Sequence, residues 1–298
     1  MPIRVLALLA VGACGRIGFL ELGLDHDAGS GSIDGPGICQ GTGAFTGLQQ
    51  LANVNSLAAE DSAEISRDGL SIYLNASNAL AFSTRPTVAD GFSAPVPIAS
   101  LNAGGPASDP SVTADNLEML FSSDRGGLPC IYRATRATTA AEWGGLTLIP
   151  ALCSGSSTGG PAISGDGLTV VYNTQLDVLG EGDLFISHRT SRAVEFAAGQ
   201  KLANLPASTG YAWLSADQLR LYFEHTVSMG NQVIELERAF RISPSDDFTN
   251  VQPIAELDDA GNSSTVDISL DPTESVVYFA TNRAGGANDL WSAERPCL

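Results

Sequence analysis

The sequence is poor in charge, and poorest in positive charge. Only 16% of its 298 residues are charged, and 33 acidic residues against 15 basic ones give a net charge of −18. A chain of this sign repels phosphate backbones and anionic membrane surfaces, and no basic stripe with interleaved aromatic residues offsets that repulsion. We therefore expect no nucleic-acid partner, whereas cations and partners with basic patches are favoured.

Several motifs that carry chemistry are also missing. There is no HExxH, P-loop, dinucleotide fingerprint, EF-hand or CxxC pair. A serine triad has poor support, because His26 lies in a predicted tether, His188 in a predicted strand, and His225 has no evident partner. The segment 155–159 matches a nucleophile elbow by letter, but a strand is expected to follow it and not a helix.

No segment resembles a long amphipathic helix. The 32 glycines and 15 prolines favour many short strands joined by turns. The chain is nevertheless 44% hydrophobic, which is enough to bury a sizeable core. These features predict an all-β fold.

The N-terminal residues resemble a targeting segment. Arg4 precedes an apolar run that is too short to span a bilayer, and the run ends in Val-Gly-Ala before Cys14. This resembles a bacterial lipobox, so we expect residues 1–13 to be a lipoprotein signal peptide and Cys14 to be lipidated. The alternative is an ordinary secretory signal. Residues 14–38 are acidic and rich in glycine and serine, which predicts a flexible tether.

Internal repeats dominate the rest of the chain. An aromatic residue is followed, with the same internal spacing, by two aliphatic residues in five places, and the aromatics lie 47, 51, 53 and 52 residues apart. The five copies are Phe45/Leu51/Val54, Phe92/Ile98/Leu101, Trp143/Ile149/Leu152, Phe196/Leu202/Leu205 and Phe248/Ile254/Leu257. Chance does not explain five copies of one spacing.

A second pattern recurs within each unit. A turn centred on Asp68, Asp115, Asp166 or Asp217, with a divergent fifth copy at 271–274, leads into an apolar strand. A third strand then ends at an arginine in each unit. We place these arginines at Arg85, Arg136, Arg189, Arg238 and Arg295. Their recurrence indicates a structural role.

Each unit therefore holds four strands in about 50 residues, as a propeller blade does. The chain offers one lone outer strand at 45–54 and, at its other end, three strands at 267–295 that lack an outer one. We predict a five-bladed β-propeller over residues 39–298, with four-stranded antiparallel blades and the N-terminal strand closing the last blade. An open solenoid is the alternative.

Four cysteines remain after Cys14, and an oxidising compartment favours their pairing. Register between the repeats places Cys39 and Cys297 at neighbouring positions of the closing hairpin, which predicts a disulfide between them. Cys130 and Cys153 then pair within the second blade. The alternative is free, buried thiols.

The segments 109–136 and 267–295 resemble the repeat of TolB-type, WD40-like β-propellers, and they align with each other without gaps. The resemblance covers residues from about 40 onward. It implies a binding scaffold in the bacterial cell envelope and does not specify a ligand. TolB itself has six blades and an additional N-terminal domain, and its partner is a peptidoglycan-associated lipoprotein.

Propellers bind ligands at the mouth of the channel, where loops lead into the innermost strands and join the second to the third. The candidate ligand-binding residues there are Asp61, Asp109, Asp124, Arg125, Asp183, Asp267 and Arg283. Grouped carboxylates suit Ca²⁺, but the plainer interpretation is that they pair with arginines and cap turns. We therefore predict no required cofactor and no dedicated metal site.

The sequence favours a non-catalytic binding or scaffold module that presents this mouth to an envelope protein or polysaccharide. We expect a monomer, held at the outer membrane only through its lipid anchor. The alternative is a five-bladed glycoside hydrolase or lyase that uses channel carboxylates. Its candidates are the non-repeated Asp61, Asp109, Asp183, Glu224 and Asp267.

Overall fold

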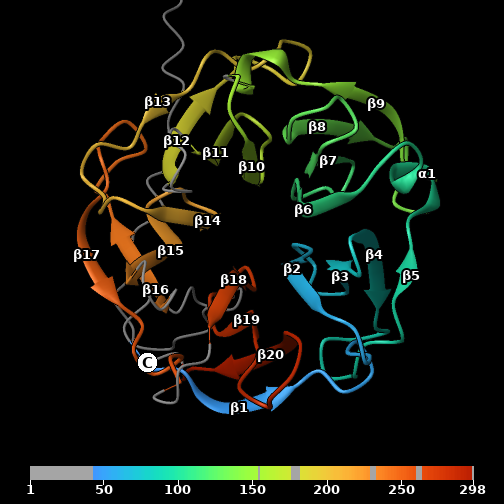
Figure 1. Ribbon diagram of the computed structural model, residues 1–298, viewed down its shortest axis with the longest axis vertical. Helices are drawn as coiled ribbons and strands as arrows, with labels where there is room; N and C mark the ends of the chain where they lie inside the picture. Colours follow the sequence, from blue (N-terminus) through green and yellow to red (C-terminus); the bar gives the residue numbers. More distant parts are fainter. Residues whose placement is uncertain (1–42, 154, 176–181, 229–232, 260–263, 297–298) are drawn as a thin grey trace, which may run out of the picture. The chain divides into compact units, whose positions relative to one another are not determined.

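The computed structural model describes residues 43–153, 155–175, 182–228, 233–259 and 264–296. They form five four-stranded antiparallel sheets arranged around a central axis, which confirms the predicted five-bladed propeller (Figure 1). The signal peptide, the tether, Cys14 and the Cys39–Cys297 pair all involve positions outside the described residues. Among the residues that are described, no helix is long and apolar enough to cross a membrane.

The blades follow one another along the chain, and each runs from an innermost to an outermost strand. Blade 1 holds β2 (Glu60–Ile65), β3 (Ser71–Ala76), β4 (Ala79–Thr84) and β5 (Val96–Pro97). Blade 2 holds β6 (Ala107–Val112), β7 (Glu118–Ser123), β8 (Cys130–Thr135) and β9 (Gly144–Leu148). Blade 3 holds β10 (Thr158–Ile163), β11 (Thr169–Gln175), β12 (Gly182–His188) and β13 (Gln200–Lys201). Blade 4 holds β14 (Thr209–Leu214), β15 (Arg220–Ser228), β16 (Val233–Phe240) and β17 (Thr249–Pro253).

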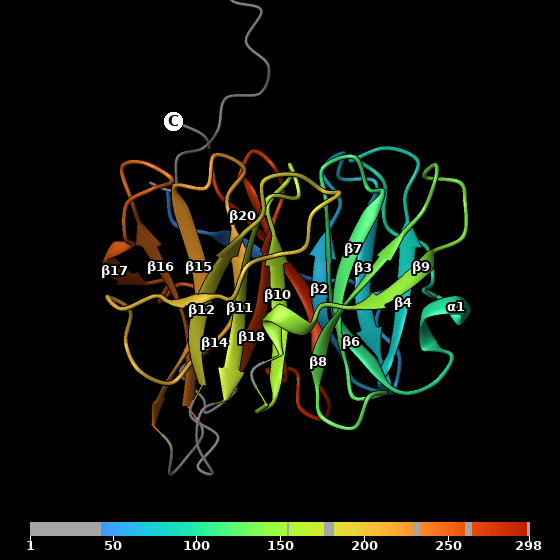
Figure 2. The same cartoon turned by 90° about the horizontal axis from the view of Figure 1, so that it is seen from above.

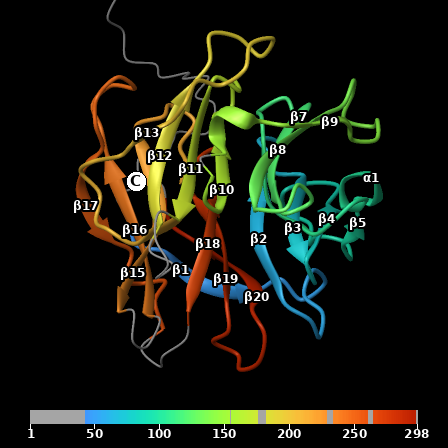
Figure 3. The same ribbon diagram turned by 45° about the horizontal axis from the view of Figure 1, so that its top comes forward.

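Blade 5 closes the ring as predicted. It holds β18 (Thr265–Leu270), β19 (Val276–Thr281) and β20 (Asp289–Glu294), and its outermost strand is β1 (Thr46–Gln50) from the other end of the propeller. Thr46 pairs with Glu294 in this closing contact. Short helical turns, α1 (Ala99–Asn102) and the 3₁₀ turn Pro150–Leu152, lie in blades 1 and 2. Figures 2 and 3 show the innermost strands running between the two faces of the propeller.

The repeated arginines and aromatic residues meet in every blade. Each guanidinium lies over the aromatic ring of its own blade, with the carbon 4.2–4.6 Å from the ring centroid. The pairs are Arg85/Phe92, Arg136/Trp143, Arg189/Phe196, Arg241/Phe248 and Arg295/Phe45. Each Nε also donates to a backbone carbonyl of the turn after its blade's innermost strand.

One predicted member of this set is wrong. The arginine of blade 4 is Arg241 and not Arg238, because β16 continues to Phe240. Blade 4 has the longest hairpin, with nine residues in β15 and eight in β16, so counting from the shorter blades stops one arginine too early. Arg238 lies within the strand, paired with Tyr222.

The repeated aspartates hold the turns, as predicted. In blade 1, Asp68 accepts hydrogen bonds from the Ser66 hydroxyl and the Leu70 N–H. The same two bonds form at Asp115, Asp166 and Asp217. In blade 5, Asp271 takes over the role by accepting from Thr273 and the Val276 N–H.

The core is divided into five clusters, and each lies between neighbouring blades. This explains why the second strands are continuous apolar runs, since both of their faces are buried. The predicted disulfide joins Cys130 to Cys153 within blade 2. It ties the start of β8 to the segment that follows the outer strand.

Candidate functional site

All five innermost strands carry a β-bulge near their start, one residue earlier in β14 than in the other four, and this bulge shapes the channel. The pairing register shifts between the second and fifth residues of β2, β6, β10 and β18, and between the first and fourth of β14. A bulge turns a side chain out of the regular alternation. The third residues of these strands are Ser62, Asp109, Gly160, Tyr211 and Asp267, and all five line one small cavity. The repeat thus supplies five equivalent channel positions, and four different residue types fill them.

Four carboxylates gather at this level. Asp109 and Asp267 come from the bulges of blades 2 and 5, Asp61 from the start of β2, and Glu224 from β15. Asp61, Asp109 and Glu224 each raise the pKa of another member through their charge. Asp109, Asp267 and Glu224 are buried, with 8%, 9% and 5% of their surfaces exposed. The cluster is therefore shielded from bulk water.

Hydrogen bonds fix these carboxylates only in part. The Ser62 hydroxyl donates to Asp109 Oδ1 at 2.9 Å, and the Gly160 N–H donates to Oδ2 at 3.4 Å. Glu224 Oε1 accepts the Asp267 N–H at 2.6 Å. Neutral donors of this kind orient a carboxylate but do not neutralise its charge.

The cluster holds protons more tightly than isolated carboxyls do. Burial, reinforced by repulsion from Asp109 and Asp61, raises the pKa of Glu224 to about 8. Burial also raises the pKa of Asp267 well above its usual value, with Glu224 as the next cause. The pKa of Asp61 is raised mainly by burial, although the hydrogen bond from Asn75 opposes the shift. At neutral pH, protons are therefore shared among Glu224, Asp267 and Asp61.

Tyr211 occupies the channel beside the carboxylates. Tyr211 is 39% exposed, and repulsion by Asp109 raises the pKa of its hydroxyl well above 10.0, so the phenol stays neutral. Its ring lies against Gly160, where a Cβ would come within 2.5 Å of the Tyr211 Cδ1 atom. The ring leaves a cavity of about 30 Å³. This is room for a water molecule or the tip of one side chain.

A fifth carboxylate, Glu64, lies two residues beyond the bulge position of β2. Its oxygens accept from the Ser269 hydroxyl at 3.1 Å and from the Ser111 hydroxyl at 3.5 Å. Both serines occupy the equivalent strand position in blades 5 and 2. Burial raises the pKa of Glu64 to about 8. The acidic lining thus continues deeper into the channel.

Within the described part of the chain, no three histidine, cysteine, aspartate or glutamate side chains are arranged to hold a metal ion. That no cofactor is required stays a prediction.

The structure brings three of the seven predicted ligand residues together: Asp61, Asp109 and Asp267. Arg125 instead donates to the Leu101 carbonyl and lies over Phe121 and Tyr132, next to Asp124 in the β7–β8 turn.

Arg283 repeats this arrangement in blade 5, where it donates to the Leu257 carbonyl and lies over Phe279 and Trp291. Asp183 is the second residue of β12 and pairs with Lys201 on the neighbouring strand. These four residues lie outside the carboxylate cluster.

Several members of the site are not among the predicted ligand residues, including Ser62, Glu64 and Gly160. Glu224 is predicted only as a hydrolase candidate, and Tyr211 is not predicted at all. Aligning the innermost strands residue by residue gives Tyr211 the same strand position as Asp109 and Asp267. The repeat alone could therefore have identified this residue as a member of the site. Glu224 similarly aligns with Asn75 in the second strands.

No family model and no curated protein sequence matches this chain. Solved structures do. A protein assigned as TolB from Agrobacterium tumefaciens is 14% identical, with a TM-score of 0.52, over 83% of this chain and 89% of its own. The α-L-arabinofuranosidase PaAbf62A from Podospora anserina is 12% identical, with a TM-score of 0.55, over 86% and 97%.

A protein assigned as a glycoside hydrolase from Parabacteroides distasonis is 11% identical, with a TM-score of 0.55, over 87% of this chain and 99% of its own. At these identities the likeness concerns the fold alone. TolB and glycoside hydrolases share that fold, so the choice between a scaffold and an enzyme depends on the site.

Proposed function

We propose that this protein is a non-catalytic binding module whose channel receives a cationic group of a partner. The observation that carries the proposal is the convergence of four carboxylates, of which Asp109 and Asp267 line one small cavity while Asp61 and Glu224 interact with them. No arginine, lysine or histidine lies among the described residues that line it. Buried carboxylates without a counter-charge are costly, and a ligand's positive charge would offset that cost.

The size of the cavity supports a narrow occupant. A space of about 30 Å³ accepts the ammonium end of a lysine or a small cation, but it is too small for a sugar ring. Three neutral hydroxyl groups nearby, from Ser62, Ser122 and Tyr211, could accept hydrogen bonds from such a group. The partner that fits best is a protein presenting a basic side chain.

We further propose that the module is anchored by lipid at Cys14, at the outer membrane of a bacterial cell. The lipobox-like sequence before Cys14 supports this proposal. Growth with radiolabelled palmitate should label the protein, and Cys14→Ala should abolish both labelling and membrane association. Labelling that persists in Cys14→Ala would refute anchoring at this residue.

The binding function is tested by passing solubilised envelope over immobilised protein and identifying what is retained. The matched control is the double variant Asp109→Asn/Asp267→Asn, which keeps the side-chain shapes and removes two carboxylates. We expect one or a few proteins to bind the wild type and to be lost from the variant. Equal retention by both would show that the channel is not the binding site.

Proton release gives a second readout. Because Glu224 and Asp267 hold protons in the free protein, a cationic occupant must displace them. Calorimetric titration of the captured partner in two buffers of different ionisation enthalpy should report net proton release near pH 7. Absence of any release would contradict insertion of a cation into the cluster.

A glycoside hydrolase is the second candidate, and one observation favours it. A carboxyl with a raised pKa, Glu224, lies in the same cluster as other carboxylates, and glycosidases pair a protonated acid with an ionised carboxylate. The small cavity beside Tyr211 argues against it. Release of reducing sugar from a polysaccharide panel by the wild type, and its loss in Glu224→Gln, would replace our proposal with this one.

A further inference from the structure

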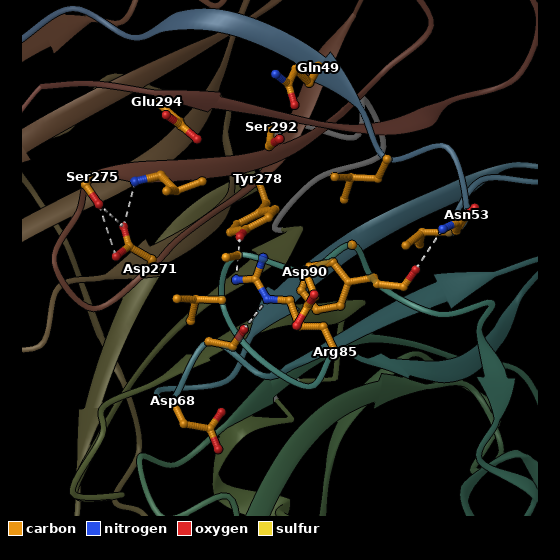
Figure 4. A pocket seen from close by; sticks show the side chains of 18 of the residues that line it. Gln49, Asn53, Asp68, Arg85, Asp90, Asp271, Ser275, Tyr278, Ser292 and Glu294 are labelled. Carbon is orange, nitrogen blue, oxygen red and sulfur yellow. Dashed lines mark hydrogen bonds between the residues drawn. The ribbon is translucent and has the colours of Figure 1, made fainter.

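A second and much larger cavity lies between blades 5 and 1. Its volume is about 790 Å³. It is lined by the closing strand β1, by the turn after β2 and the turn after β18, and by the loop after β4 (Figure 4). The turns that line it, 66–69 and 271–275, follow the C-terminal ends of β2 and β18. Asp61 and Asp267 of the channel cluster lie near the start of those same strands, so the two sites lie toward different faces.

Sequence differences between equivalent junctions explain why this groove exists. Between blades 2 and 3 the corresponding space holds an ionic network, in which Glu118 binds Arg189 and Arg133 and Arg192 binds Asp115. In blade 5 the positions of Glu118 and Arg133 are occupied by Val276 and Ser292. In blade 1 the position of Arg192 is occupied by Val88. Three long charged side chains are replaced by short ones, and the space stays open.

Arg85 forms the fixed floor of the groove. Its stacking on the Phe92 ring and its Nε bond to the Gly69 carbonyl hold the guanidinium flat, and Nη2 donates to the Tyr278 hydroxyl at 3.3 Å. Among the described residues, nothing accepts a hydrogen bond from Nη1. The equivalent Arg189 uses its Nη2 to donate to the Glu118 carboxylate, where Arg85 Nη2 meets only a neutral hydroxyl. Arg85 thus offers a pre-positioned donor to a ligand.

The opposite wall supplies further groups that the described chain leaves unused. Gln49 on β1 and Ser292 and Glu294 on β20 line the groove, and their side chains make no hydrogen bond to other described residues. Figure 4 shows these three side chains on the wall facing Arg85. The two walls together therefore present a donor-only group, an acceptor-only group, and two groups that both donate and accept.

The charge balance selects the ligand class. Four carboxylates and two arginines line the groove: Asp68, Asp90, Asp271, Glu294, Arg67 and Arg85. An anionic ligand is therefore disfavoured. An apolar ligand would leave both the arginine and the carboxylate unsatisfied. Sugar hydroxyls both donate and accept, so they satisfy both walls, and the volume lies within the usual range for small-molecule sites.

We propose that the groove between blades 5 and 1 binds a short neutral oligosaccharide. This site is separate from the channel, so the protein would hold a glycan on one face and its cationic partner on the other. The proposal does not depend on the function of the channel.

The test uses titration calorimetry of the full mature chain with cellotriose, xylotriose, maltotriose and chitotriose. Ser292→Arg restores the side chain that fills the sister junction, and Thr147→Arg makes the same change on exposed β9. We expect at least one trisaccharide to bind saturably, Ser292→Arg to weaken it by about tenfold or more, and Thr147→Arg to leave it unchanged.

Two further variants keep the test decisive. If Ser292→Arg does not fold, the exposed pair Gln49→Ala/Glu294→Gln should weaken binding in its place. The channel variant Asp109→Asn/Asp267→Asn should bind the sugar normally, whatever its effect on the protein partner. Failure of every trisaccharide to bind, equal binding by the groove variants, or saturable binding of a neutral tetrapeptide without any sugar would overturn the proposal.

Discussion

The five arginine–aromatic pairs, one in each blade and here called the belt, repeat with the same residue types, whereas the equivalent positions of the channel do not. In the belt, all five blades use the same pair, an arginine stacked on an aromatic ring. In the channel, the five equivalent bulge positions carry five residues of which only two are alike: serine, aspartate, glycine, tyrosine and aspartate. The backbone repeats through both regions, but the side chains repeat only in the first.

This difference distinguishes residues that stabilise the fold from residues that the fold tolerates. The belt pairs satisfy a guanidinium with a carbonyl and an aromatic face, so each copy stabilises its own blade. The channel instead buries carboxylates beside one another, which costs free energy in the folded state. A costly, non-repeated cluster in a repetitive scaffold is best explained by binding.

The largest expected effect comes from breaking the belt. Arg189→Ala removes the stack on Phe196 and leaves the Glu118 carboxylate, which is buried, without its best partner. We expect the free energy of unfolding to fall by about 3–5 kcal/mol, measured by chemical denaturation. Arg67→Ala, at an exposed position on an equivalent turn, is the control and should cost less than about 0.5 kcal/mol. Similar small losses of unfolding free energy for both variants would mean that the belt contributes little to stability.

Neutralising a channel carboxylate should instead increase the free energy of unfolding. The pKa of Glu224 is about 8 in the folded protein, against 4.5 for an ordinary glutamate, so the folded state binds the extra proton between these values. Stability from this group is therefore fully present below pH 4.5 and is lost as the pH rises through 8. Glu224→Gln mimics the protonated form.

We expect Glu224→Gln to stabilise the protein at about pH 9 by on the order of a few kcal/mol and to have little effect at about pH 4.5. Thermal unfolding across this range measures the difference. Glu142→Gln, an exposed glutamate, should leave the profile unchanged. Parallel profiles for Glu224→Gln and the wild type would show that the carboxyl is not held protonated.

The belt residues can be predicted from the sequence because their spacing within each repeat is nearly constant. Phe45 and Arg295 lie at opposite ends of the propeller, yet their matched spacing predicted the closure that brings them together. The assignment failed where a blade departs in length: the longer hairpin of blade 4 moved the arginine from 238 to 241.

The channel was only partly accessible. Asp109 and Asp267 stand out as acidic residues that enter innermost strands. Tyr211 and Gly160 do not, because their roles depend on the bulge that turns them toward one another. The turns that hold Arg125 and Arg283 predict positions at the mouth, but both side chains bond to loop carbonyls. Proximity along a repeat does not give side-chain direction.

A smaller effect separates backbone strain from crowding at the channel. Gly160 has φ of +55°, and a Cβ there would collide with the Tyr211 ring. Gly47 in β1 has φ of +67°, and no atom of the described residues lies within 4 Å of the position that a Cβ would take, so it reports the cost of φ alone. We expect Gly47→Ala to cost about 1 kcal/mol and Gly160→Ala to cost about 1–3 kcal/mol more. Equal losses in denaturation would show that Tyr211 moves freely and that the channel is wider than its resting cavity.

The smallest effect is expected at an acidic residue that the structure places outside the cluster. Asp183 binds Lys201 at 2.6 Å, and the lysine side chain is half exposed. An exposed pair of this kind contributes little, so Asp183→Asn should change the free energy of unfolding by less than about 0.5 kcal/mol. It should also retain the envelope partner, whereas Asp109→Asn/Asp267→Asn should lose it in the same assay. Loss of the partner in Asp183→Asn would move the binding surface from the channel to the rim of blade 3, because this change leaves the four clustered carboxylates in place.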